Sequence, residues 1–390
     1  MANLLIVGAS ARAAASSARR AGFAPWCADL FADSDLRAMV PDAMRCPANE
    51  YPHGLANLLA SAPMAPWIYT GGLENHPQLI AKMARLRPLW GNGPAALRLC
   101  RDPFAIQRIL RDAGLPSLQV HSDGSKLSPG CRWLRKPRKG SAGQGISFAD
   151  RGTGGRSRTH YYQQYVEGAP MSAVFVRARE TVRLLGVTEQ LIGIDWLNAP
   201  AFRYCGNIGP ADLAEGMGSE LLQIGRVLGN GCGLQGLFGV DFIAKDGRPW
   251  VVEVNPRYPA SVEVLEMATG MAALSFHRQA FDRAVCAIPS ADSRGEFVGK
   301  AILYAPRRLV MPPAGVLAGL SSAEMDSRRA QTGAKWAISD VPETGEAVES
   351  GWPILTVLVR DKSRFGCLSL LHRTARSIVQ TMDRTMLERS

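Results

Sequence analysis

The sequence predicts a chain of several packed units that combines an α/β layer with α+β parts. Its 390 residues are more than one hydrophobic core usually serves, so two or three units are expected. Near the N-terminus, short apolar strands alternate with helical segments, which is typical of a parallel sheet covered by helices. Further along, apolar segments joined by short turns that contain glycine predict antiparallel hairpins.

The N-terminal part carries the parallel layer. Residues 4–7, Leu-Leu-Ile-Val, run into Gly8, and an alanine-rich segment over 13–21 ends at Gly22. This order predicts a strand, a glycine turn and a helix. A second apolar strand is expected at 66–69, and the layer should extend to about residue 95. Its glycines do not form the G-x-G-x-x-G pattern, so no dinucleotide-binding fingerprint is present.

The remaining elements follow from the same patterns. A helix is expected from about residue 101 to Gly114, and then two strands at 132–136 and 145–148 joined by a glycine-rich loop. A helix over 211–228, stopped by Gly229, precedes a hairpin of 237–244 and 249–254. The C-terminal hundred residues should form strands around 297–304 and 353–360 and a final helix that includes Leu368 and Met386.

Composition and charge limit the partners. The net charge of +11 favours an anionic partner, such as a phosphate, a carboxylate, nucleic acid or an acidic surface. We predict no signal peptide, and no membrane span either, because Pro63 and Pro66 interrupt the uncharged stretch 54–73. The eight cysteines form no C-x-x-C pair, so neither a zinc site nor a disulfide framework is indicated, and a reducing cytoplasm fits best.

The strongest candidate for chemistry is the hairpin from Gly239 to Arg257. Residues two apart on a strand share a face, so Glu253 and Asn255 should point the same way, and a three-residue loop over 246–248 would place Asp241 opposite Glu253. Two facing carboxylates repel each other, and a bound divalent cation would offset this repulsion. Oxygen ligands suit Mg²⁺, with Mn²⁺ as the alternative. Arg257 adds a planar group for an oxyanion. The competing interpretation is a solvated hairpin with polar edges.

A second candidate is the segment from Lys136 through a glycine-rich loop. Backbone N–H groups of such a loop can wrap phosphates, and Lys136 would supply a point charge. The loop is not a Walker A motif, because no G-K-[ST] closes it. A flexible surface turn, or a nucleic-acid patch of the basic residues between Arg132 and Lys139, remains open. The loop residues in question are Gly140, Ser141, Gly143 and Gly145.

A third candidate is the segment 161–168, Tyr-Tyr-Gln-Gln-Tyr-Val-Glu-Gly, which reads as a strand that ends in a turn. Its exposed backbone would offer the carbonyl of Gln164 and the N–H of Val166 to an adenine edge. A tyrosine-rich core strand is the alternative.

In order and spacing, these three segments resemble the ATP-grasp fold. The run Leu-Ile-Val-Gly8-Ala-Ser-Ala-Arg12 resembles predicted ATP-dependent carboligases related to biotin carboxylase, and the stretches that begin at Asp340 and Trp352 resemble the C-terminal domain of biotin carboxylases. The resemblance implies a Rossmann-like pre-ATP-grasp domain over 1–97, an ATP-grasp domain over 98–292, and a C-terminal β-rich domain with a terminal helix over 293–390.

The resemblance also implies roles for individual residues. Asp241, Glu253 and Asn255 would hold magnesium, and Arg257 would stabilise the transition state for acyl-phosphate formation. Lys136 would contact the ATP phosphates beneath the loop of Gly140, Ser141, Gly143 and Gly145. The adenine and ribose hinge would be formed by Gln164, Tyr165, Val166 and Glu167. Glu74 resembles a loop residue that faces the nucleotide.

The sequence departs from the family pattern in two places. Pro103 occupies the position where many ATP-grasp enzymes carry a second phosphate-binding lysine, so Arg98 or Arg101 must substitute, or the contact is missing. The stretch around Lys335 lacks the arginine that biotin carboxylases use near bicarbonate, which argues against carboxylation of biotin.

These observations lead us to expect an ATP-dependent carboxylate–amine ligase. It would join an acidic small molecule to an amine acceptor through an acyl phosphate, in the biosynthesis of a coenzyme such as a one-carbon carrier. The alternatives are bicarbonate activation through carboxyphosphate, and an ATP-binding protein without turnover. We expect neither a nucleic acid nor a membrane as a partner, and because related carboxylases are often dimers, a homodimer is expected.

Overall fold

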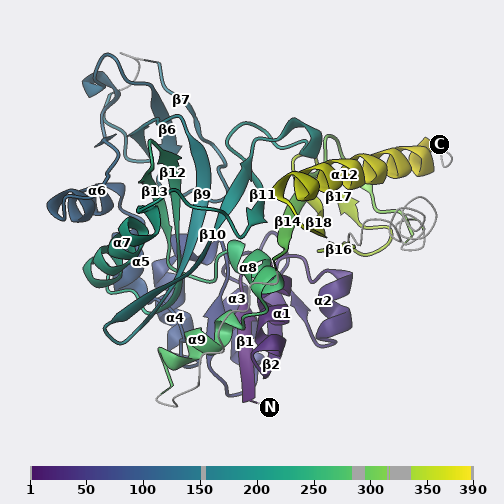
Figure 1. Ribbon diagram of the computed structural model, residues 1–390. Coiled ribbons are helices and arrows are strands. Elements are labelled where there is room, and N and C mark those ends of the chain that lie inside the picture. Colours follow the sequence, from purple (N-terminus) through teal and green to yellow (C-terminus); the bar gives the residue numbers. More distant parts are fainter. Residues whose placement is uncertain (1, 151–154, 283–294, 314–315, 317–334, 388–390) are drawn as a thin grey trace.

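The computed structural model describes residues 2–150, 155–282, 295–313, 316 and 335–387. Three sheets and their flanking helices make up most of this part, together with a short two-stranded ribbon. Figure 1 shows the N-terminal sheet at the bottom, a small sheet at the upper left and helix α12 at the upper right. Within the described residues, no helix is both long and apolar enough to cross a membrane.

The N-terminal sheet is parallel, with strand order β3-β2-β1-β4, which confirms the predicted α/β layer. Strand β1 is buried on both faces: Leu4 and Ile6 pack on the side of α1, and Leu5 and Val7 on the side of α3 and α4. Its strands are β1 (Ala2–Val7), β2 (Phe23–Asp29), β3 (Met44–Arg45) and β4 (Trp67–Tyr69). Its helices are α1 (Arg12–Arg20), α2 (Ser34–Met39), α3 (Leu55–Ser61), η1 (Leu73–Asn75) and α4 (Pro77–Ala84).

A small antiparallel sheet, of order β5-β8-β6-β7, follows two helices. The strands predicted at 132–136 and 145–148 pair with each other here, joined by the glycine-rich loop. The helices are α5 (Pro94–Cys100) and α6 (Pro103–Asp112), and η2 (Gly124–Lys126) lies in a connection. The strands are β5 (Val120–His121), β6 (Trp133–Pro137), β7 (Ser147–Phe148) and β8 (His160–Gln164).

The central sheet has eight strands among the described residues, in the order β13-β12-β9-β10-β11-β14-β18-β16, and every neighbouring pair is antiparallel. The C-terminal strands continue this sheet, because β14 pairs with β11. Its first strands are β9 (Ala169–Ala178), β10 (Thr181–Ile192), β11 (Tyr204–Gly209), β12 (Gly236–Lys245) and β13 (Arg248–Asn255). The others are β14 (Phe297–Tyr304), β16 (Lys335–Ser339) and β18 (Pro353–Asp361). The division of the chain at residues 97 and 292 stays a prediction.

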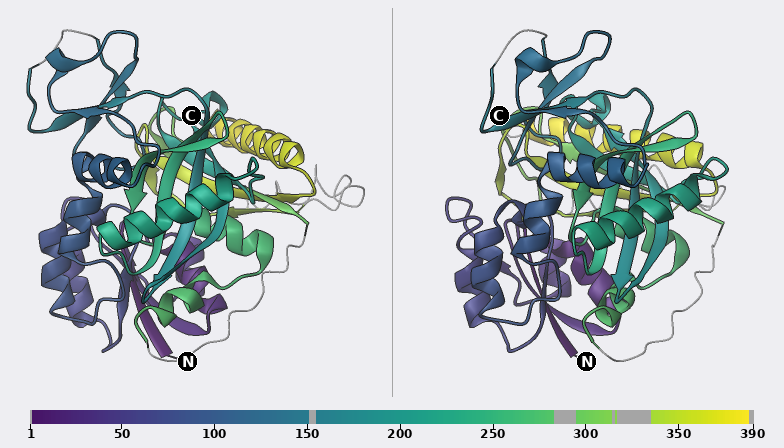
Figure 2. Two further views of the ribbon diagram at one scale, coloured as in Figure 1. Left: turned by 60° about the vertical axis from the view of Figure 1, so that its left-hand side comes forward. Right: turned by 90° about the vertical axis from the view of Figure 1, so that its left-hand side faces the viewer.

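Helices cover both faces of the central sheet (Figure 2). Along β9, Ala173 and Phe175 pack toward α7, while Val174 and Val176 pack toward α1 and α9. Alternation then places Asp241 of β12 on the second face, because its neighbours Val240 and Phe242 belong to the core on the α7 side. The helices are α7 (Met217–Gly231), α8 (Ser261–Thr269), α9 (Ala273–Gln279) and α12 (Arg364–Leu387). Shorter elements are η3 (Asp195–Leu197) and the ribbon of β15 (Leu309–Val310) and β17 (Ala347–Val348).

The prediction of a helix over 211–228 was wrong at both ends. Helix α7 begins at Met217 because Gly216 adopts a left-handed conformation, with φ 77°, which a helix cannot contain. Gly229 does not stop it: a Cβ there would lie 3.1 Å from Cδ of Arg177, so this glycine allows close packing. The left-handed residue after the helix is Gly233, with φ 63°.

Candidate active site

The hairpin of β12 and β13 brings Asp241 opposite Glu253, as the sequence predicted, but by another route. The connection is a two-residue turn, Asp246 and Gly247, both left-handed with φ 52° and 73°. Such a turn alone would pair Asp241 with Val252. A bulge after Asp241 shifts the register by one residue, so that the two carboxylates meet across the strands.

A continuous polar network extends from this pair toward the N-terminal sheet. The side-chain amide of Asn255 donates to Oδ2 of Asp241 at 2.9 Å, and Nη2 of Arg257 donates to Oδ1 of Asn255 at 2.9 Å. Nε of Arg257 donates to Oε1 of Glu74 at 3.1 Å. Glu74 lies in η1, so the network fixes the planar Arg257 group between the hairpin and the N-terminal part.

The two facing carboxylates differ in proton affinity. Burial, and then the charge of Glu253, raise the pKa of Asp241 to about 6. Burial acts in the same direction on Glu253, but the charges of Arg101 and Lys136 outweigh it and lower the pKa of that group. The pair therefore concentrates negative charge on one face of the hairpin, where a cation would be stabilised.

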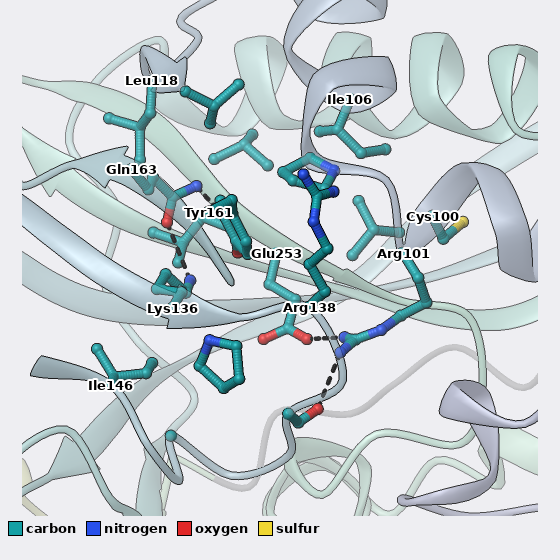
Figure 3. Close-up of a pocket in the computed structure, with 18 of the residues that line it drawn as sticks. Cys100, Arg101, Ile106, Leu118, Lys136, Arg138, Ile146, Tyr161, Gln163 and Glu253 are labelled. Carbon is teal, nitrogen blue, oxygen red and sulfur yellow. Dashed lines mark hydrogen bonds and ion pairs between the residues drawn. The ribbon is translucent and has the colours of Figure 1, made fainter. Parts of the chain in front are cut away.

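Lys136 joins the small sheet to this hairpin. It is buried on β6, and its Nζ donates to Oε1 of Gln163 at 2.9 Å. Nε2 of Gln163 donates in turn to the backbone carbonyl of Val252 at 3.2 Å. Figure 3 shows Lys136 and Gln163 in contact, with Glu253 on the facing strand. Lys136 also lines both cavities of the site, where its Nζ can contact an anionic ligand.

The glycine-rich loop is closed against η1 and the central sheet. The carbonyl of Gly140 accepts from Nδ2 of Asn75 at 3.2 Å, and the carbonyl of Ala142 accepts from the N–H of Tyr204 at 3.1 Å. Gly143 has φ 77°, and a Cβ there would lie 1.7 Å from the carbonyl oxygen of Phe202. This close approach requires glycine at position 143. Gly145 is left-handed as well, with φ 74°.

Arg101 lies in the site, whereas Arg98 is exposed on α5. Nη1 of Arg101 forms an ion pair with Glu253, and Nη2 donates to the carbonyl of Gly140 at 2.8 Å (Figure 3). Of the two arginines that the sequence offered, Arg101 is therefore the one that can reach a ligand beneath the loop.

Two adjacent cavities meet at Lys136, Glu253 and the loop over 141–143. The smaller, of about 60 Å³, lies beside Arg101 and α6. The larger, of about 400 Å³, is lined by Asp241, Asn255 and Arg257 and extends to both the N-terminal and the C-terminal parts. Several buried polar atoms around them lack a hydrogen-bond partner: Oγ1 of Thr70, Oε2 of Glu74 and Nε of Arg101. Such atoms indicate a polar ligand.

The comparison with protein families agrees with this geometry. Residues 100–261 match the ATP-grasp domain family. The chain contains an ATP-grasp domain. The match spans α6, the small sheet and the hairpin, so it includes Lys136, the loop and the carboxylate pair. The match confirms the predicted ATP-grasp fold.

Other proteins are similar to this chain over most of its length. The "Uncharacterized protein MJ0776" of Methanocaldococcus jannaschii is 22% identical over 92% of this chain and 88% of its own. A biotin carboxylase from Campylobacter jejuni, solved as a β,γ-ATP complex, superposes with a TM-score of 0.69 at 16% identity, over 94% of this chain and 89% of its own. An L-amino acid ligase from Bacillus licheniformis superposes with a TM-score of 0.67 at 16% identity, over 96% of this chain and 97% of its own.

The four residues expected at the adenine hinge of the ATP-grasp domain lie outside both cavities. The N–H of Gln164 donates to the carbonyl of Gln119, and that of Tyr165 to the carbonyl of Arg132, each at 2.9 Å. Val166 is buried and Glu167 is exposed, so the hinge role stays a prediction. From β8, Tyr161 and Gln163 line the smaller cavity, and sequence reasoning missed Gln163. Tyr161 pairs with Lys136 on the adjacent strand, so strand alternation places Gln163 on the same face as Lys136.

The donor set fits magnesium. Asp241, Glu253 and Asn255 offer oxygen atoms from one face of the hairpin, the ligand type that Mg²⁺ prefers. The described residues contain no group of three or more His, Cys, Asp and Glu side chains that could hold a metal ion by itself. An ion bound here would therefore complete its shell with nucleotide phosphates and water.

Proposed function

We propose that this ATP-grasp protein is an ATP-dependent carboxylate–amine ligase that activates an acidic small molecule as an acyl phosphate. The observation that supports this best is the convergence of Asp241, Glu253, Lys136 and Arg257 on one pair of connected cavities. Carboxylates are poor electrophiles, and phosphoryl transfer from ATP converts them into reactive ones. This transfer needs positive charge around the phosphate and little else.

Each cation of the site has a part in that step. Lys136, on β6 beneath the glycine-rich loop, would bind the ATP phosphates, and Arg101 beside it would take the place of the missing lysine. Mg²⁺, when bound by Asp241, Glu253 and Asn255, would neutralise charge that develops on the transferred phosphoryl group. The loop, closed on Phe202, would exclude water from the acyl phosphate.

Arg257 is suited to hold the substrate acid. Its contacts with Glu74 and Asn255 orient the guanidinium, which lines the larger cavity and can donate to two oxygens at once. The amine then attacks the acyl carbon: the C–N bond forms, the C–O bond to phosphate breaks, inorganic phosphate leaves and the amine loses a proton. Loss of Arg257 should slow the reaction about 10²–10³-fold, the usual effect of removing one contact to a developing oxyanion.

A coupled ADP-release assay tests this proposal. The enzyme would be supplied with Mg-ATP and a panel of amino acids and pterin- or furan-type coenzyme acids, each with and without an amine. ADP release that needs both an acid and an amine, and that Glu253→Gln abolishes, is the expected result. Glu220→Gln is the matched control, because Glu220 forms an exposed ion pair with Arg248 near the same hairpin.

Two other outcomes would replace the proposal. ADP release with bicarbonate and no other acid would assign carboxyphosphate chemistry. Binding of Mg-ATP without ADP release under any condition would assign a nucleotide-binding protein without turnover.

We also propose a homodimer, which sedimentation of the purified protein would reveal.

A further inference from the structure

The larger cavity is also lined by residues that the proposed phosphoryl transfer does not use. Phe31 and Asp33, in the loop after β2, line it together with Asp340, Leu355 and Thr356 from the C-terminal part. The proposed nucleotide and acid contacts, Lys136, Glu253 and Arg257, line the same cavity. Nothing in the proposed phosphoryl transfer accounts for Asp33.

Asp33 is a buried carboxylate without a partner in the described part of the chain. It is 5% exposed and precedes α2, yet its side chain does not cap that helix. The neighbouring carboxylates are occupied. Asp35 accepts the N–H groups of Asp340 and Val341 at 3.0 and 3.1 Å, and Asp340 accepts from Nε and Nη2 of Arg12, each at 2.9 Å.

Carboxylates outnumber cations around Asp33. Two buried cations, Arg12 and Lys300, both contact Glu263, and Arg12 also contacts Asp340. Asp35 shares Arg12 at 3.7 Å, and Asp33 has no ion pair within the described residues. Burial, followed by the charges of Asp340, Asp29 and Asp35, raises the pKa of Asp33 to about 8. A bound cation would relieve this repulsion.

The backbone that carries Asp33 is held in an unfavourable conformation. Ala32 has φ 48°, in the left-handed region that alanine avoids. The carboxylate of Asp29 imposes this shape by accepting the N–H groups of Phe31 at 3.1 Å and Ala32 at 2.6 Å. Strained backbone that surrounding contacts enforce is common at ligand sites. Here it presents Phe31 and Asp33 to the cavity.

We propose that Asp33 binds the ammonium group of the acceptor amine, and that Phe31, Ile302 and Leu355 enclose an apolar body next to it. The inference rests on the proposed ligase function and deepens it by assigning the class of the second substrate: an apolar primary amine. The acid and the amine would then occupy neighbouring places in one cavity, with Arg257 for the acid and Asp33 for the amine, so that the amine nitrogen can reach the acyl carbon.

Calorimetric titration of the full chain, saturated with Mg²⁺ and the non-hydrolysable analogue AMP-PNP, tests this inference. The probes are benzylamine, benzyl alcohol and phenylacetate, which share a ring and differ in charge. We expect benzylamine to bind tightest, and Asp33→Asn to weaken it about 10- to 100-fold, the effect of losing one charge-assisted hydrogen bond. The exposed Asp42→Asn variant should bind benzylamine as the parent does.

The outcomes separate the two proposals. Asp33→Asn should still bind Mg-AMP-PNP, since Asp33 touches none of the proposed nucleotide contacts, and this binding also shows that the variant is folded. Equal binding of benzylamine by the parent and Asp33→Asn overturns the inference, as does a parent that binds none of the probes or prefers phenylacetate. Failure of the parent to bind Mg-AMP-PNP would instead overturn the proposed function.

Discussion

Arg101 and Glu253, which lie 152 positions apart in the chain, form an ion pair at the junction of the two cavities. The same guanidinium holds the carbonyl of Gly140, so one side chain connects the carboxylate proposed for magnesium with the loop proposed for phosphates. We propose that Arg101 would contact the nucleotide phosphates in place of the lysine that is missing at the position of Pro103.

The first prediction concerns this arginine. Arg101→Ala should raise the KM for ATP about 10- to 100-fold, because charge-assisted hydrogen bonds are lost, while Arg98→Ala should leave it unchanged because Arg98 is exposed on α5. Steady-state ADP release at varied ATP concentration measures both. The reverse pattern would assign the phosphate contact to Arg98.

The second prediction concerns the closed loop. Gly143→Ala should lower kcat and raise the KM for ATP, since a methyl group cannot fit 1.7 Å from the carbonyl of Phe202 and the loop cannot close. Gly130→Ala is the matched control: Gly130 is left-handed as well, with φ 88°, but a Cβ there meets nothing within 4 Å. It should lose about 1–2 kcal/mol of stability from the left-handed backbone alone. Equal kinetic effects of the two variants would refute a role for loop closure.

Local patterns predicted much of this site, and long-range contacts account for the rest. A three-residue loop over 246–248 was expected to pair Asp241 with Glu253, and the pair forms. The Asp246-Gly247 turn has a sequence signal, but the bulge after Asp241 that compensates for the shorter turn has none. A glycine in a sequence can mark either a helix end or a close contact. Gly229 was predicted to end the helix, because its packing against Arg177 cannot be inferred from the residues next to it in the sequence. That Asp33 has no partner among the described residues cannot be predicted from the sequence either, because the residues around it come from separate segments that only the fold brings together.

The third prediction concerns the buried ion cluster that joins the N-terminal and C-terminal parts. Arg12→Leu leaves Asp340 without its guanidinium and Glu263 with Lys300 alone, and should lower the free energy of unfolding by about 3–5 kcal/mol. Arg19→Leu, an exposed substitution on the same helix, should change it little. Urea denaturation compares them, and a loss below about 1 kcal/mol for Arg12→Leu would contradict the importance of the cluster.

The fourth prediction concerns pH. His277 is buried and neutral, with Nδ1 accepting from the N–H of Leu237 at 2.8 Å and Nε2 donating to the carbonyl of Trp90 at 2.9 Å. Burial lowers its pKa from 6.5 to about 4. Between these values the unfolded chain binds more protons, so stability should fall as the pH drops through this range, by up to about 3 kcal/mol.

Thermal unfolding at pH 7.5 and pH 5.0 measures this effect. His277→Gln should lose less stability on acidification than the parent, whereas the exposed His53→Gln should behave as the parent does. An equal loss in the parent and His277→Gln would show that another group controls the acid sensitivity.

Magnesium-dependent nucleotide binding tests the central claim most directly. Titration of the parent with AMP-PNP should show tight binding with Mg²⁺ and much weaker binding with EDTA, and Glu253→Gln should abolish this dependence while Glu220→Gln retains it. Nucleotide binding that is equally tight in the parent and Glu253→Gln, with or without Mg²⁺, would contradict the assignment of the Asp241 and Glu253 hairpin as the metal–nucleotide site.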